Sequence, residues 1–317
     1  MSNPIMSRNS YFTEQRTPAG YPTMPGYAPG NDQQGQQQYG QQYAGQQYGE
    51  AQYTQPAQQY GTQQGYGYEQ TAFPQDNRAA NGEPAITYED IMMKTGILLG
   101  VTILAGALSW MLLIPSGATS SDISLGMTIA VGSSLAAFVV GLVMAFKRQL
   151  GPGLTIGYSA LQGVALGTLT GVLEVIYPGI AVQTILATVS VVAVCWFLHT
   201  TGLVRTTSKG MKIVLTIMIA GVVFSLANLF LSWTGMVDAP WGMRSAEIAG
   251  IPLGVFLGII MIVVASYMLI NDFETAKIAV ANRAPKSFAW TAAVGIVMTI
   301  MWIYLEILRL IAILNQD

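Results

Sequence analysis

The sequence predicts an all-α integral membrane protein, a seven-transmembrane helical bundle that follows a disordered N-terminal tail. Three observations lead to this prediction. Hydrophobic residues make up 52% of the 317 residues and charged residues only 9%, whereas about a quarter of an ordinary soluble domain is charged. Beyond residue 94 the apolar residues form runs close to the ~20 residues with which a helix crosses the hydrocarbon core of a bilayer. Before residue 76 the chain is instead rich in Gln, Tyr and Gly.

Residues 1–87 are predicted to form a disordered cytoplasmic tail. Between residues 36 and 70 a Gln-Gln-Tyr-Gly unit repeats irregularly, without any Leu, Ile or Val. Burial of apolar surface therefore cannot offset the entropy lost on ordering this segment. Two interpretations stay open, a solvated spacer or a weakly self-associating segment of the prion-like type. The predicted division of the chain is a tail of residues 1–87 and a membrane domain of residues 88–317.

Seven apolar runs predict the membrane spans in order. They cover residues 95–114, 124–146, 154–176, 180–198, 211–233, 248–270 and 288–314. The runs are continuous, whereas the strands of a membrane barrel alternate between apolar and polar residues. Pro152 and Pro178, each followed by Gly, predict turns before and after the third span. On that span Gly163, Gly167 and Gly171 recur at every fourth position, which permits close packing against another helix.

Basic residues predict the orientation of the bundle. Twelve of the fourteen Lys and Arg residues belong to the tail or to the connections on the same side as the tail. Arg244, in a connection on the opposite side, and Arg309, within the last span, are the exceptions. Because basic residues accumulate on the cytoplasmic side, the N-terminus is predicted to be cytoplasmic and the C-terminus to be outside. The expected location is the cytoplasmic membrane of a cell, with multiple passes.

Several classes of protein are excluded by composition. A net charge of −2 without clustered Lys and Arg excludes a nucleic-acid partner held by a broad basic field. One cysteine, Cys195, and one histidine, His199, exclude a disulfide framework and a zinc site with four Cys and His ligands. No His-Glu-x-x-His motif is present. We therefore expect no enzyme, no cofactor and no resident metal. The expected partners are the lipid bilayer, a second copy of the chain or a membrane protease.

Charged groups inside apolar runs are costly, so they mark candidate sites. Glu306 and Arg309 lie three residues apart on one helix face and can pair, either as a structural ion pair or as part of a functional site. Asp272 lies just past the last aliphatic residue of the sixth run, and spacing alone places it at the membrane interface. Gln162 and Glu174 of the third run are possible secondary polar contacts of a pore, and Glu174 is expected near a helix end.

Three motifs point to a known family. Residues 268–272 (MLIND) end the sixth run, residues 304–308 (YLEIL) lie in the last run, and residues 152–158 (PGLTIGY) begin the third. Over residues 88–315 the chain resembles the Bax inhibitor-1 family, including its bacterial YccA-like members. Its tail and the segments at residues 289–293 and 305–310 are similar to versions from high-GC Gram-positive bacteria.

The resemblance implies a pH-sensitive cation leak, with calcium as a possible transported ion, gated by Asp272 and Glu306 on the last two spans. Two acids close together in a low-dielectric environment cannot both ionise cheaply and would share a proton. When both are ionised they would attract a hard divalent cation. Arg309 would keep Glu306 ionised, which leaves Asp272 as the titrating member. Its protonation is then expected to change the contact between Glu306 and Arg309.

Two questions stay open at this point. The two acids touch only if the sixth helix enters the protein interior beyond residue 270 and the seventh helix starts late or tilts. The function also has an alternative, a membrane scaffold or regulator that conducts nothing. Such a protein would act through helix contacts with a membrane protease or another complex and would use its tail as a handle.

Overall fold

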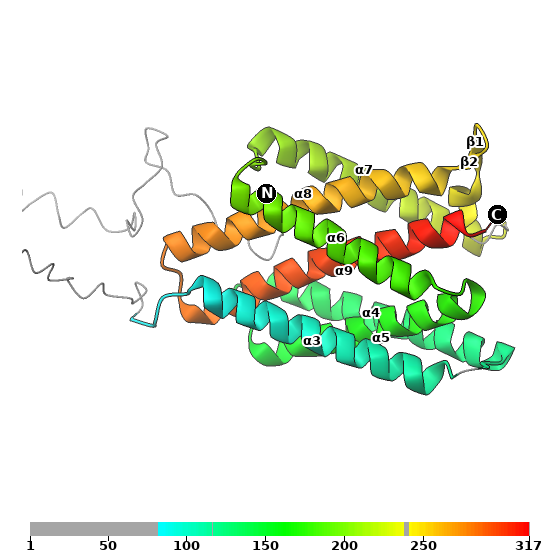
Figure 1. Cartoon of the computed structure of the whole chain (residues 1–317), viewed down its shortest axis with the longest axis horizontal. Coiled ribbons are helices and arrows are strands. Elements are labelled where there is room, and N and C mark those ends of the chain that lie inside the picture. Colours follow the sequence, from blue (N-terminus) through cyan, green and yellow to red (C-terminus); the bar gives the residue numbers. More distant parts are fainter. Residues whose placement is uncertain (1–81, 116, 238–240, 317) are drawn as a thin grey trace, which may run out of the picture. The chain divides into compact units, whose positions relative to one another are not determined.

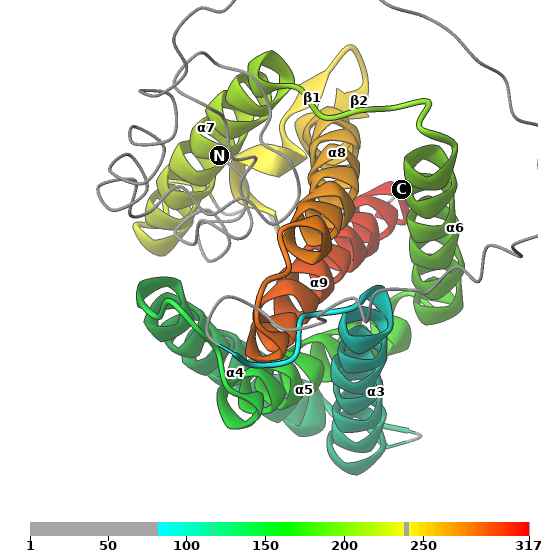
Figure 2. The same cartoon turned by 90° about the vertical axis from the view of Figure 1, so that its left-hand side faces the viewer.

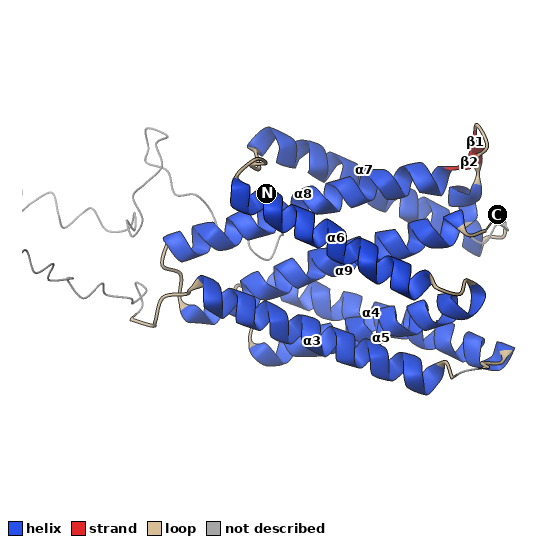
Figure 3. Cartoon of the chain, in the orientation of Figure 1, coloured by secondary structure: helices blue, strands red, loops and turns tan. Residues whose placement is uncertain are grey.

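The computed structural model describes residues 82–115, 117–237 and 241–316, so most of the predicted tail lies outside the described residues. Within the described part, seven helices are long and apolar enough to cross a membrane (Figure 1 and Figure 3). In chain order they are α3 (Tyr88–Leu113), α4 (Ser120–Phe146), α5 (Pro152–Ile176), α6 (Ile180–Thr201), α7 (Ser208–Trp233), α8 (Leu253–Ala281) and α9 (Ala289–Leu314). The predicted fold class is confirmed, and the chain is a multi-pass membrane protein.

The first two helices begin earlier than the apolar runs because polar side chains cap them. At the start of α3, the Thr87 side chain accepts a hydrogen bond from the backbone of Asp90, and the Asp90 side chain accepts one from the backbone of Thr87. Thr119 and Asp122 form the same reciprocal pair at the start of α4. These pairs satisfy amide groups that a helix start leaves without partners. A hydropathy run begins only after such polar residues.

The sixth span departs most from its predicted bounds of residues 248–270. Two short antiparallel strands, β1 (Glu247–Ile248) and β2 (Ile251–Pro252), occupy the predicted start. The 3-10 helix η2 (Gly242–Ser245) precedes them. At the other end α8 continues to Ala281, because Phe273, Ala276 and Ala279 extend its buried apolar face. Asp272, two residues past the end of the apolar run, therefore lies within the helix.

Helix α9 lies at the centre of the bundle. Its buried residues extend from Ala289 to Ile313, and it contacts α3, α5, α6 and α8. The view along the bundle shows α8 and α9 near the middle, with the other helices around them (Figure 2). By contrast, α7 packs against α8 and η2 and buries only Met211 and Val214. These two central helices, α8 and α9, carry the candidate residues Asp272 and Glu306.

The glycine stripe on α5 is a packing surface for α3. Gly163 lies against the backbone of Thr102, and Gly167 lies against the backbone of Gly106. A Cβ atom added to Gly167 would overlap that backbone. Only glycine lets the two helix backbones approach so closely. The predicted packing role of the stripe is confirmed.

Candidate functional site

Asp272 is fully buried between α8 and α9. Its side chain has no exposed surface, and its Oδ2 accepts a hydrogen bond of 2.5 Å from Thr299 Oγ1 of α9. Its Oδ1 is buried and has no hydrogen-bond partner among the described residues. Spacing alone did not indicate this burial within the bundle. The reason is that α8 continues beyond the apolar run and carries Asp272 inward.

The surroundings of Asp272 define what this carboxyl group can do. Leu269 and Phe273, close to Asp272 on α8, and Ile303, one turn after Thr299 on α9, belong to the largest apolar cluster among the described residues. Within the described residues, no Lys or Arg forms an ion pair with Asp272. A buried carboxylate without a charged partner is costly, and a proton or a cation at the free oxygen relieves that cost. Asp272 is thus suited to exchange protons or cations.

Glu306 forms the ion pair that its spacing predicts. The Glu306 side chain is almost fully buried, and its Oε2 lies 2.9 Å from Arg309 Nη1. Its Oε1 accepts hydrogen bonds from Arg309 Nη1 at 3.0 Å and from Trp302 Nε1 at 3.2 Å. The negative charge of Glu306 is therefore balanced on the same helix.

The two acids occupy different levels of α9. Asp272 lies at the level of Thr299, which precedes Glu306 by seven residues, or about 10 Å along the helix axis. Among the described residues, no hydrogen bond or ion pair joins Asp272 to Glu306. The direct partner of Asp272 is a hydroxyl group. The sequence does not mark Thr299, because a threonine inside an apolar helix ordinarily bonds a carbonyl of its own helix.

Arg244 of η2 adds a second buried guanidinium near Glu306 and Arg309. Its side chain is buried, and its Nη2 donates to Ser225 Oγ of α7 at 3.4 Å. Burial lowers the pKa of Arg244, the positive charge of Arg309 lowers it further, and the negative charge of Glu306 raises it. The three charges thus share one environment, at the end of the bundle where α9 ends. In the sequence, Arg244 contributed only to the predicted orientation of the bundle. A single basic residue in a connection on that side could, however, have marked it as a candidate residue of the site.

The two secondary candidates of α5 stand apart from these acids. Glu174 accepts hydrogen bonds from the backbone amides of Gly179 at 2.7 Å and Ala181 at 2.9 Å. It therefore caps the start of α6, where the helix favours a negative charge, and both of its oxygens are occupied. Gln162 is half-buried. Within the described part of the chain, neither side chain hydrogen-bonds Asp272 or Glu306.

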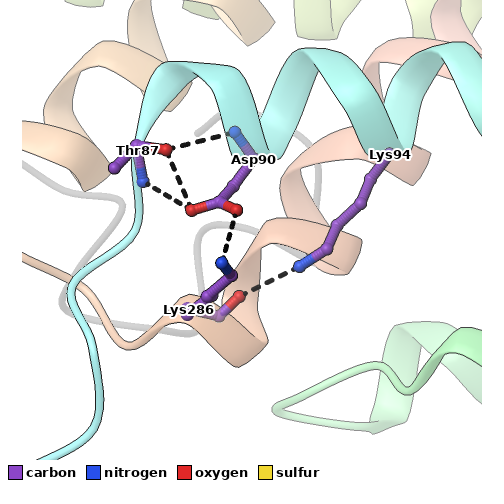
Figure 4. A network of polar contacts seen from close by, with 4 residues as sticks. All are labelled: Thr87, Asp90, Lys94 and Lys286. Atoms are coloured by element: carbon purple, nitrogen blue, oxygen red, sulfur yellow. Dashed lines mark hydrogen bonds and ion pairs between the residues drawn. The ribbon is translucent and has the colours of Figure 1, made fainter.

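A strap closes the end of the bundle where α3 begins. We define the strap as residues 83–90 together with the α8–α9 connection at residues 284–287. Lys286 Nζ lies 2.9 Å from Asp90 Oδ1, and Lys94 Nζ donates to the Lys286 carbonyl at 3.2 Å (Figure 4). The Ile86 amide donates to the Ala284 carbonyl at 2.7 Å. The predicted tail boundary at residue 87 lies inside this strap, which holds the two helices of Asp272 and Thr299.

Comparison with known protein families gives a match over nearly the whole chain. A family model described as Bax inhibitor 1 like matches residues 3–316. No match is found among curated proteins or among solved structures. The family match covers all seven helices and the site formed by Asp272 and Thr299.

Proposed function

Because the chain belongs to the Bax inhibitor-1-like family, we propose that it forms a pH-sensitive leak pathway for calcium or other cations in the cytoplasmic membrane. The family is associated with leak of cations, including calcium, across membranes. The observation that carries the proposal is the buried carboxyl group of Asp272, which has one oxygen without a partner. A proton or a cation at that oxygen would change the charge of the bundle interior.

Asp272 is the group whose charge changes. When protonated it is neutral, and it adds no attraction for a cation. When ionised it offers carboxylate oxygen, the ligand type that hard cations such as calcium prefer. Glu306 is paired with Arg309 at 2.9 Å, so its negative charge is balanced on its own helix. A pH change therefore alters the pathway by one charge, at Asp272.

The ion pair of Glu306 and Arg309 forms a second polar position along the same cation pathway. Thr299, which holds Asp272, lies on α9 two turns before Glu306. We expect a change in the contact between Asp272 and Thr299 to shift α9 and so to reach the ion pair. This link supports the hypothesis that protonation of Asp272 changes the contact between Glu306 and Arg309.

The experiment is calcium flux into liposomes that contain the purified protein, measured between about pH 5 and pH 8. Asp272→Asn mimics the protonated acid at every pH. Its flux is expected to equal the low-pH limit of the wild-type protein throughout the range. Glu89→Gln, on the exposed first turn of α3, is the matched control and should keep the wild-type profile. An Asp272→Asn variant that retains the wild-type pH dependence would refute the role of Asp272.

A membrane scaffold or regulator remains the alternative function. In that case a helix such as α7, which buries only Met211 and Val214, would supply the contacts with a partner in the membrane. Flat flux traces from correctly folded protein would support this alternative. Deletion of residues 1–81, which leaves the strap intact, should spare a leak but disable a scaffold that acts through its tail.

A further inference from the structure

A groove of about 320 Å³ opens between α3, α6 and α8. It lies at the end of the bundle where α3 begins and where α6 and α8 end. Met92, Trp196 and Phe273 supply apolar walls, and His199 and Lys277 supply nitrogen atoms. The Trp196 side chain is exposed, so the groove is open toward the surrounding membrane.

The end of the bundle that contains this groove is rich in basic residues. Lys277 is exposed, and within the described residues it forms no ion pair. The carboxylate of the nearby Glu274 accepts hydrogen bonds from the backbone amide and the hydroxyl of Thr206. Nine of the eleven Lys and Arg residues in the described part of the chain belong to this end of the bundle.

We propose that this groove binds an acidic phospholipid. The phosphate group would lie against Lys277 and His199, and the upper part of an acyl chain would lie against Met92, Trp196 and Phe273. Basic pockets between helices near a membrane surface have this affinity for anionic headgroups. Aromatic rings such as those of Tyr88 and Trp196 favour the same depth, because they are amphipathic.

The apolar walls of the groove and the positive charge of Lys277 together select an acidic phospholipid. A free phosphate would contact Lys277 but would leave the apolar walls unused. A zwitterionic lipid would fill the walls, but its own cationic group would lie near Lys277. Only an anionic amphiphile satisfies both parts of the groove. The inference does not depend on whether the protein conducts ions.

The test uses the full-length protein in a nonionic detergent. Its thermal unfolding is followed during titration with phosphatidylglycerol or with phosphatidylcholine of the same acyl chains. Phosphatidylglycerol is expected to raise the unfolding temperature well above the effect of phosphatidylcholine. Lys277→Gln should weaken the apparent affinity for phosphatidylglycerol about fivefold, the factor expected for one basic residue near an anionic surface.

Three further variants separate this site from general charge effects. Lys277→Arg should retain the wild-type affinity, and Trp196→Ala should weaken binding without a change in charge. Lys147→Gln removes an exposed charge from the α4–α5 connection and should leave the affinity unchanged. Equal effects of the two lipids, an equal loss in Lys147→Gln and Lys277→Gln, or the same stabilisation by glycerol phosphate alone would each overturn the proposal.

Discussion

Thr299→Val tests whether the hydroxyl group of Thr299 controls the charge state of Asp272. Valine has nearly the same shape but cannot donate, so Asp272 Oδ2 loses its partner at 2.5 Å. A hydrogen bond to a charged group contributes about 1.5–3 kcal/mol, and one to a neutral group about 0.5–1.5 kcal/mol. The ionised form of Asp272 therefore loses more stabilisation than the neutral form, by about 1–1.5 kcal/mol.

This difference predicts a shift in the pH dependence of calcium flux. One pH unit corresponds to about 1.36 kcal/mol, so the midpoint should move upward by about 1 pH unit. The direction is upward because a higher pH is then needed to ionise Asp272. The assay is liposome flux across the pH range in which the wild-type protein titrates.

The matched control is Thr216→Val on α7. Thr216 is exposed, and its hydroxyl group bonds only the Lys212 carbonyl of its own helix, at 2.9 Å. This variant should keep the wild-type midpoint. If Thr299→Val folds correctly and its midpoint also stays unchanged, the hydrogen bond to Asp272 does not govern the response to pH, and the reasoning is refuted.

Two further predictions concern stability. Gly167→Ala should lower the free energy of unfolding by about 1–3 kcal/mol, because the added methyl group overpacks the contact between α3 and α5. Gly132→Ala, where a Cβ atom meets nothing within 4 Å, should be neutral or stabilising in the same thermal unfolding experiment; similar losses in both would contradict the packing argument. Arg309→Gln should destabilise the bundle by on the order of 3 kcal/mol, because it leaves Glu306 charged and nearly buried. Glu306→Gln combined with Arg309→Gln should recover most of that loss, and a double variant as unstable as the single one would count against the ion pair.

The helical bundle and the pairing of Glu306 with Arg309 could be predicted from the sequence because both depend on local properties. A continuous apolar run of sufficient length has few alternatives to a membrane-spanning helix, since its backbone must satisfy its own hydrogen bonds in lipid. Residues three apart on a helix share a face whatever the rest of the fold does. The glycine stripe likewise indicated a close helix contact, although the sequence did not say that α3 would supply it.

The tertiary structure decided what surrounds each candidate residue. Asp272 seemed interfacial by hydropathy, but the buried face of α8 continues past it and Thr299 of α9 meets it. Glu174 resembled a pore ligand by position, yet it caps the neighbouring helix α6. These outcomes depend on which helices lie side by side and at what relative height. Hydropathy sets how much of a helix lies in lipid, but the partner of a buried polar group is chosen by packing between helices that are distant in the sequence.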